Sequence, residues 1–218
     1  MKHINTFESF LYEQKLFEIG EGSQPFPWKL RSGTTVKDWI KTMEQDTQKG
    51  SSFPFVMLDP LMFDFKGDKA SYYVRVSMYY QRHKTISFLM KPGFEPHKFD
   101  IVLVVDFDVE GRSDNRITNF GEQFRVITTV SNIFEDVIKQ LDKVDWAKVQ
   151  EIHIAAKLED DEEGLPIAQT KRGRFYLEYI KKQGRRLPGD WSVFINNDEY
   201  VIQRGKWTTK EMGKIINL

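Results

Sequence analysis

One run of apolar residues constrains the fold of this chain more than any other feature. Between Phe99 and Val109, five consecutive aliphatic residues from Ile101 to Val105 are followed by Phe107. A strand with one wet face would carry polar residues at every second position, whereas a continuous apolar run is typical of a strand covered on both faces. The run therefore predicts a central strand of a sheet, with other elements packed on each side.

Two segments in the C-terminal half have the periodicity of amphipathic helices. In residues 121–141 apolar positions recur every three or four residues, and residues 170–183 repeat the pattern with aromatic side chains. Asn119 and Glu122 have the spacing of a capping box, which predicts a helix start near Gly121. The residues predicted to face inward are Phe124, Ile127, Val130, Phe134, Val137, Ile138 and Leu141, and then Phe175, Tyr176, Tyr179 and Ile180.

The rest of the chain predicts shorter elements. Helical spacing favours short helices in residues 1–19 and 34–47, and two prolines make residues 24–28 extended, with Phe26 and Trp28 anchored on the sheet. Further strands are predicted in residues 53–65, 72–80, 85–90, 151–156, 191–195 and 200–203, with a turn at Gly67 and Asp68 and a hairpin connection at residues 82–84.

Together these elements predict an α+β fold, with a mostly antiparallel mixed sheet flanked by two long amphipathic helices. Residues 34–218 are predicted to form a single domain, preceded by a helix and an extended arm in residues 1–33.

The composition excludes several classes of site and partner. The chain has no cysteine, so disulfides, thiolate metal sites and thiol nucleophiles are excluded. Its 32 basic and 32 acidic residues give a formal net charge of zero, so no overall field attracts nucleic acid or an anionic membrane. No run approaches the roughly 20 apolar residues that span a bilayer. We expect no membrane partner, while the 14% aromatic content favours contacts with other protein subunits.

Carboxylates at the end of the central strand are candidates for a metal site. Asp106, Asp108 and Glu110 alternate along the strand and could share a cation or a proton. The alternative interpretation is an exposed strand end beside a polar turn. No further ligand motif accompanies them, and we expect no bound metal.

Among the histidines, His153 is the candidate for a general base because it lies within a predicted strand and imidazole carries protons near neutral pH. It could equally be a sheet histidine with satisfied hydrogen bonds. The four histidines, at positions 3, 83, 97 and 153, lack the spacing of a zinc site.

A basic segment accompanies the second long helix, and it could bind a polyanion. The alternative is a solvated helix face, neutralised in part by the acidic residues 159–163. The candidate polyanion-binding residues are Lys171, Arg172, Arg174, Lys181, Lys182, Arg185 and Arg186.

The chain resembles proteins encoded by tailed phages in two respects. Its first residues, MKHINTFESFLYE, are similar to the openings of phage proteins, some of which target their protein to the capsid. The segments Leu16–Gly20, Pro25–Trp28, Gly121–Val130 and Arg174–Ile180 resemble those of a group of uncharacterised phage-encoded proteins. The resemblance implies a location in the host cytoplasm or the virion, and no catalytic residues.

The order strand, helix, strand, helix, strand from Phe99 to Ile195 is also similar to the C-terminal half of GCN5-related N-acetyltransferases. In that family a helix N-terminus holds the pyrophosphate of acetyl-CoA, which implies a role for Asn119, Phe120 and Gly121. Tyr176 lies near the tyrosine that acts as an acid in the family. The family's loop reads Gln/Arg-x-x-Gly-x-Gly/Ala, whereas this chain reads RITNFG at residues 116–121, with the glycine displaced.

These observations leave three functional hypotheses. The leading one is a phage-encoded, non-enzymatic protein without a cofactor, which is virion-associated or a packaged accessory and acts through protein contacts. It rests on the absence of a nucleophile elbow, a Walker loop or a dinucleotide loop. The alternatives are a divergent acyltransferase-like enzyme and a nucleic-acid accessory that uses the basic helix in residues 171–186.

Overall fold

The computed structural model describes eight segments of the chain. These are residues 24–31, 33–49, 56–82, 99–110, 122–155, 170–195, 199–205 and 215–217. Of the predicted features, the helix in residues 1–19, the strand in residues 85–90, most of the connection at residues 82–84 and the acidic segment 159–163 lie outside them.

Within these segments the chain forms three helices and one sheet of nine strands. The helices are α2 (Val36–Lys49), α3 (Gln123–Leu141) and α4 (Lys171–Gly184). The strands are β1 (Trp28–Leu30), β2 (Val56–Met57), β3 (Leu61–Lys66), β4 (Ser71–Arg82), β5 (Phe99–Val109), β6 (Ala147–Ala155), β7 (Trp191–Ile195), β8 (Glu199–Arg204) and β9 (Ile215–Asn217). The predicted α+β class is confirmed. None of the described helices is long and apolar enough to cross a membrane.

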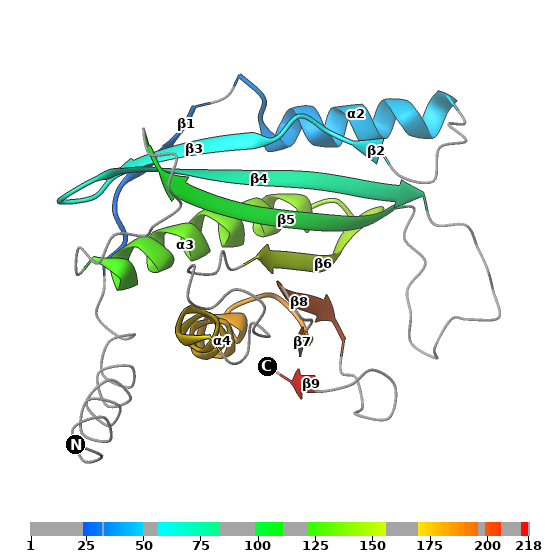
Figure 1. The fold of residues 1–218 in the computed structure, drawn as a ribbon. Coiled ribbons are helices and arrows are strands. Elements are labelled where there is room, and N and C mark those ends of the chain that lie inside the picture. Colours follow the sequence, from blue (N-terminus) through cyan, green and yellow to red (C-terminus); the bar gives the residue numbers. More distant parts are fainter. Residues whose placement is uncertain are drawn as a thin grey trace, which may run out of the picture.

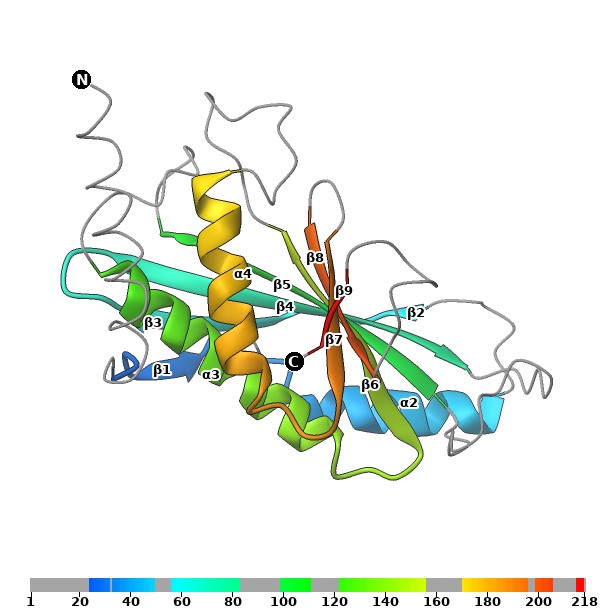
Figure 2. The same cartoon turned by 90° about the horizontal axis from the view of Figure 1, so that it is seen from below.

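The sheet follows the order β1-β3-β4-β5-β6-β8-β7-β9, with β2 paired to β4 outside this path (Figure 1). Among the described pairs, β5 and β6 are parallel and the others are antiparallel. A parallel pair needs a crossover, and α3 supplies it. The sheet twists strongly, so β7 and β8 run at a steep angle to β3 and β4 (Figure 2).

The central strand was placed correctly by the sequence, with the predicted bounds and an interior position between β4 and β6. The prediction that both faces of this strand are covered by other elements was wrong. Alternate residues from Phe99 to Val105 are buried against the helices, while Val102 and Val104 on the opposite face are half-exposed. β-branched residues suit the pleated backbone of a strand whether or not they are buried, so the apolar run did not require two covered faces.

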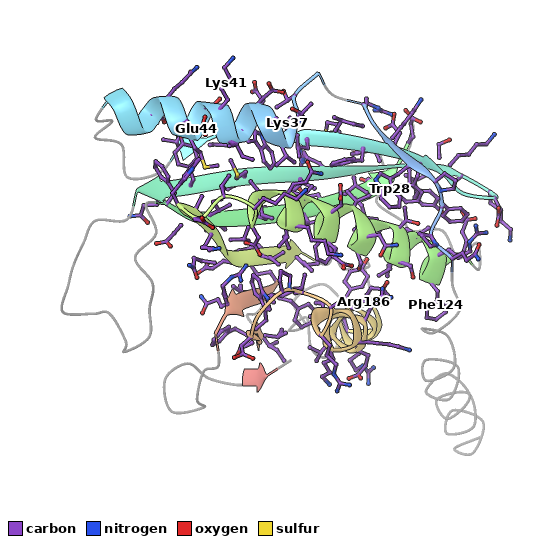
Figure 3. All side chains as sticks on the ribbon, turned by 180° about the vertical axis from the view of Figure 1, so that it is seen from behind. Trp28, Lys37, Lys41, Glu44, Phe124 and Arg186 are labelled. Atoms are coloured by element: carbon purple, nitrogen blue, oxygen red, sulfur yellow. The ribbon has the colours of Figure 1, made fainter. Side chains whose placement is uncertain are left out.

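All three helices pack on the same face of the sheet, and not on opposite faces as the apolar run predicts. On this face the Tyr80 hydroxyl of β4 hydrogen-bonds Asp46 of α2, and Phe107 of β5 meets the ring of Tyr176 on α4 at a centroid distance of 6.3 Å. Seen from behind, α2 and α3 lie in front of the strands, and side chains fill the space between them and the sheet (Figure 3).

Helix α2 begins with a capping interaction and buries one apolar side. Thr35 precedes the first turn, where its N–H donates to Asp38 Oδ2 over 2.8 Å and its hydroxyl oxygen accepts from the Asp38 N–H over 3.3 Å. Trp39 and Met43 are buried, whereas Lys41 lies on the outer side of the helix (Figure 3). The helix starts at Val36 and not at Thr34.

Other boundaries differ by a few residues. Helix α3 begins at Gln123 and not near Gly121, β6 begins at Ala147 and not at Glu151, and β9 was not predicted. Of the two predicted anchors of the arm, Phe26 is buried and stacks on Phe65, but Trp28 is 36% exposed.

Candidate functional site

The parallel pairing of β5 and β6 ends before β5 does. It runs from Phe99 opposite Ala147 to Val105 opposite Ile154, with one extra residue of β6 bulged between Ile101 and Val102 of β5. The described part of β6 ends one residue later, at Ala155. From Asp106 to Val109, the described pairing of β5 is with β4.

An apolar cavity of about 40 Å³ lies beside the last parallel pair, Val105 and Ile154, between the sheet and the facing sides of α3 and α4. A buried water needs roughly 10–15 Å³ of such space, so the cavity has room for about three water-sized groups. Val105 and Phe107 of β5 and Ile154 of β6 form its floor, and its walls include Val130 of α3 and Tyr176 and Ile180 of α4.

Two tyrosines of α4 stand in the cavity wall. Tyr176 is 6% exposed and its ring lies edge-on to Phe107. Tyr179 donates its hydroxyl proton to Thr128 Oγ1 over 3.1 Å, and burial raises its pKa, so it stays neutral across the physiological range. The residue that the acetyltransferase resemblance singles out, Tyr176, thus lines this cavity together with Val105 and Ile154, the last parallel pair of β5 and β6.

The first turn of α4 is fixed at both its backbone and its cap. Thr170 precedes the helix, is fully buried, and accepts the Gly173 N–H at its hydroxyl oxygen over 2.8 Å. The hydroxyl of Tyr200 on β8 donates to the Gly173 carbonyl over 2.7 Å. Burial, and to a lesser extent the charge of Glu178, raises the pKa of Tyr200 to about 12, so this bond persists at neutral pH. These two bonds fix the first turn of α4, and the Tyr200 bond joins it to β8.

A buried carboxylate marks the start of α3. Glu122 is 7% exposed, and it accepts the Tyr72 hydroxyl over 2.7 Å and the Asp68 N–H over 2.8 Å. The predicted capping box is wrong for Glu122, because it is the residue before the helix and its side chain makes no capping bond. It ties the β3–β4 hairpin to the positive end of α3 instead. The pyrophosphate candidates, Asn119, Phe120 and Gly121, lie outside the described residues.

His153 belongs to a polar cluster on the face of the sheet opposite the helices. Its Nε2 lies 3.1 Å from Glu151 Oε2 and its Nδ1 lies 3.1 Å from Glu199 Oε2. Gln203 donates to the second oxygen of Glu151 over 2.7 Å. The sequence offered one signal for this cluster, the shared strand face of Glu151 and His153, but it gave no sign that β8 would bring Glu199 alongside.

The ionisation of this cluster follows from its contacts. The hydrogen bond to Glu151, opposed by burial and helped by Glu199, raises the pKa of His153. The same bond, with help from Gln203, lowers the pKa of Glu151. A protonated ring donates from both nitrogens, so the imidazolium joins β6 to β8. To act as a base, His153 would first have to release this proton.

The three carboxylates at the end of β5 do not converge. Asp106 pairs with Arg75 over 2.7 Å, Asp108 Oδ1 accepts the Val109 N–H over 2.8 Å, and Glu110 pairs with Arg31 over 2.5 Å. In the part of the chain that the structure describes, no three His, Asp or Glu side chains come together as a metal site requires.

The basic residues of α4 are engaged locally to different extents. Lys181 pairs with Glu178 over 2.5 Å, and Arg174 donates to the Thr170 carbonyl over 3.4 Å. Arg185 and Arg186 are exposed beyond the end of the helix and Lys182 is half-exposed, while the side chains of Lys171 and Arg172 lie outside what the structure describes. Binding of a polyanion here stays a prediction.

The cavity itself could be anticipated only in part. The sequence placed Val130, Tyr176, Tyr179 and Ile180 on inward helix faces, but it did not indicate that α3 and α4 leave a space between them. No family model, curated protein or solved structure matches this chain, so its phage and acetyltransferase resemblances remain predictions.

Proposed function

We propose that the chain is a divergent acyltransferase of the GCN5-related kind, which takes an acyl group from acyl-CoA and passes it to an amine. One observation carries the proposal: Tyr176 lines an apolar cavity beside Val105 and Ile154, the last parallel pair of β5 and β6. An acyl-CoA site of this kind needs a cavity near the carboxyl ends of the parallel strands.

The order of elements supports the proposal. The described chain runs through β5, α3, β6, α4 and β7, which is the order on which the acetyltransferase resemblance rests. β5 and β6 are parallel neighbours, and the cavity lies between the two helices that follow them. Ligands of open sheets with parallel strands bind in the crevice outside the carboxyl ends of those strands.

The sequence before α3 gives further support. In the family pattern Gln/Arg-x-x-Gly-x-Gly/Ala, Arg116 and Gly121 fit the first and last positions, and Asn119 stands at the first glycine. Asparagine adopts left-handed backbone more readily than most residues, so it is a reasonable replacement. The loop ends two residues before α3 begins at Gln123.

The resemblance assigns Tyr176 the role of an acid in the transfer step. The amine nitrogen would attack the thioester carbonyl carbon, form the new C–N bond and break the C–S bond. CoA would leave as a thiolate and take the hydroxyl proton of Tyr176. The proton released by the amine passes to water, and the tyrosinate regains a proton from water because its ordinary pKa is about 10.

Thermal unfolding with CoA and acetyl-CoA tests the binding step. A ligand present at 100 times its dissociation constant stabilises the native state by about 2.7 kcal/mol, which raises Tm by roughly 5–10 °C in a chain of this size. The absence of any shift at millimolar CoA or acetyl-CoA would overturn the proposal.

Substitution of Tyr176→Phe tests the chemistry separately. We expect Y176F to bind CoA as the parent does and to transfer acetyl to an amine about 10²-fold more slowly, because it lacks the proton donor. Tyr73→Phe is the matched control, since Tyr73 lies half-exposed on the opposite face of the sheet. Equal transfer rates in Y176F and Y73F, measured by thiol release, would remove the role of Tyr176.

A second candidate is the interaction protein that the composition favours. β1 is the last strand on its side of the described sheet, and its Trp28 and Leu30 are 36% and 38% exposed (Figure 3). An edge strand with exposed apolar side chains is suited to a protein contact. The test is whether mass spectrometry finds the chain in purified virions. The W28A/L30A variant should be missing from the virions. The control variant K37A/K41A, with its changes on the outer side of α2, should still be present.

A further inference from the structure

We propose that the cavity between α3 and α4 selects an acyl chain longer than acetyl, of about four carbons, with the carbonyl carbon beside Tyr176 and about three further groups in the space available. This inference rests on the proposed function, because it assigns the acyl end of the donor to the cavity beside Tyr176.

The length of the cavity is the first argument. Its α4 wall extends from Tyr176 to Gly184, eight residues along the helix, or about 12 Å at 1.5 Å per residue. Its α3 wall extends from Ile127 to Phe134. A methyl group placed next to Tyr176 would occupy one of the roughly three group-sized spaces and leave the others empty.

The chemistry of the lining is the second argument. The lining includes the apolar side chains of Ile127, Val130, Phe134, Ile180, Leu187 and Ile202. The polar groups in the wall are the hydroxyls of Ser131, Tyr176 and Tyr179, and Tyr179 already donates to Thr128. An apolar cavity with few polar partners stays dry and takes up apolar ligands.

The lining also excludes one alternative class of acyl group. Among the described residues, no charged side chain belongs to the wall of this cavity. A dicarboxylic acyl group would bring a carboxylate into apolar surroundings without a cation to pair with it, which is strongly unfavourable. The chain that fits is therefore uncharged and apolar.

A series of CoA esters measures the preference directly. Each buried methylene improves affinity about fourfold, so we expect dissociation constants to fall from acetyl-CoA to butyryl-CoA. They should rise again for hexanoyl-CoA and decanoyl-CoA, which exceed the space. Affinity that is independent of chain length, greatest for acetyl, or still increasing at decanoyl would overturn the inference.

Two conservative variants in the wall provide opposite shifts. Val130→Ile adds one methylene and should move the optimum toward shorter chains, whereas Ile127→Val removes one and should move it toward longer chains. Both residues are buried, and changes of one methylene keep the fold, which the Tm of the free proteins verifies. An optimum that stays in place in both variants would contradict the assignment of the chain to this cavity.

A probe without CoA separates the two proposals. If 1-propanol raises Tm more than methanol does, and V130I abolishes the difference, while no CoA ester binds, the proposed function fails and the chain-selective cavity stands. If CoA and all its esters bind equally, the function survives and the chain selection fails.

Discussion

At the scale of single residues, the contacts of Gly67 and His153 can be tested most directly. Gly67 lies in the turn between β3 and β4, against the carboxylate and ring that fix the start of α3. His153 is held between two carboxylates on neighbouring strands. Both depend on partners far away in sequence, so each reports on the tertiary structure and not on local propensity.

Replacement of Gly67 by alanine should destabilise the protein. A Cβ at this position would lie 2.6 Å from Glu122 Oε1 and 2.9 Å from Tyr72 Cε2, so the hydrogen bond between these two residues must shift. We expect a loss of about 1–3 kcal/mol in the free energy of unfolding. Gly33→Ala is the control, because a Cβ there meets nothing within 4 Å and should change stability by less than about 1 kcal/mol. Equal denaturation midpoints for G67A and G33A would contradict the described turn.

The pH dependence of stability should depend on His153. The folded-state pKa of its ring is raised above the ordinary 6.5, so its contribution is complete below pH 6.5 and is lost as pH rises through the folded value. The pKa of Glu151 is lowered from 4.5, so its contribution is present above that pH and is lost on acidification. Among the described residues, the ionisable groups in contact with the ring are Glu151 on its own strand and Glu199 on β8, while its neighbour on β5 is the uncharged Val104. Asp106, on the same face of β5, pairs with Arg75 of β4.

Substitution of His153→Gln removes the titrating ring and retains a polar side chain. We expect the decrease in Tm between about pH 6.5 and pH 9 to be smaller in H153Q than in the parent, because the lost group is the one that deprotonates there. The ring pKa, read from the imidazole proton shifts by NMR, should lie above 6.5. A ring pKa below 6.5, or the same dependence of Tm on pH above 6.5 in both proteins, would contradict the described hydrogen bonds of His153 with Glu151 and Glu199.

At the scale of elements, β5 shows what hydrophobic pattern can and cannot determine. Its bounds and its interior place in the sheet were predicted because a long run of β-branched and aliphatic residues is typical of an interior strand. The face of the sheet on which the helices pack was not predicted, because Val102 and Val104 are half-exposed although they are apolar. Helix α3 was likewise predicted from its periodicity, while the partner of Glu122 could not be, since Tyr72 lies 50 residues earlier in the chain.

A matched pair of substitutions in β5 tests whether only one face is packed. Val105 is buried against the helices, and its neighbour Val104 faces the other way. Val105→Thr should cost about 1–3 kcal/mol because it buries a hydroxyl in an apolar wall. Val104→Thr should stay within about 0.5 kcal/mol. Chemical denaturation of both variants measures this, and a similar loss in each would indicate that both faces of the sheet are covered.

At the scale of the whole molecule, sequence periodicity was enough for the fold class and insufficient for the site. The helices and the interior strand could be predicted from local pattern, which determines what each segment becomes. The cavity depends on how far apart α3 and α4 settle, and on where β5 and β6 cease to pair, and both are set by contacts between distant segments. Tyr176 was singled out by resemblance, whereas Ile202 and Leu187 in the same wall had no local signal.

The docking of Phe26 affects how the chain folds. Its N–H donates to Thr129 Oγ1 over 2.8 Å across 103 residues of sequence, and Arg125 lies 3.8 Å above its ring. Closing so long a loop before α3 has formed costs conformational entropy and gains few contacts. The extended segment that contains Phe26 should therefore attach after the rate-limiting step of folding. Phe26→Ala should then accelerate unfolding and leave the refolding rate nearly unchanged in stopped-flow measurements. Slower refolding would instead place the arm in the folding nucleus.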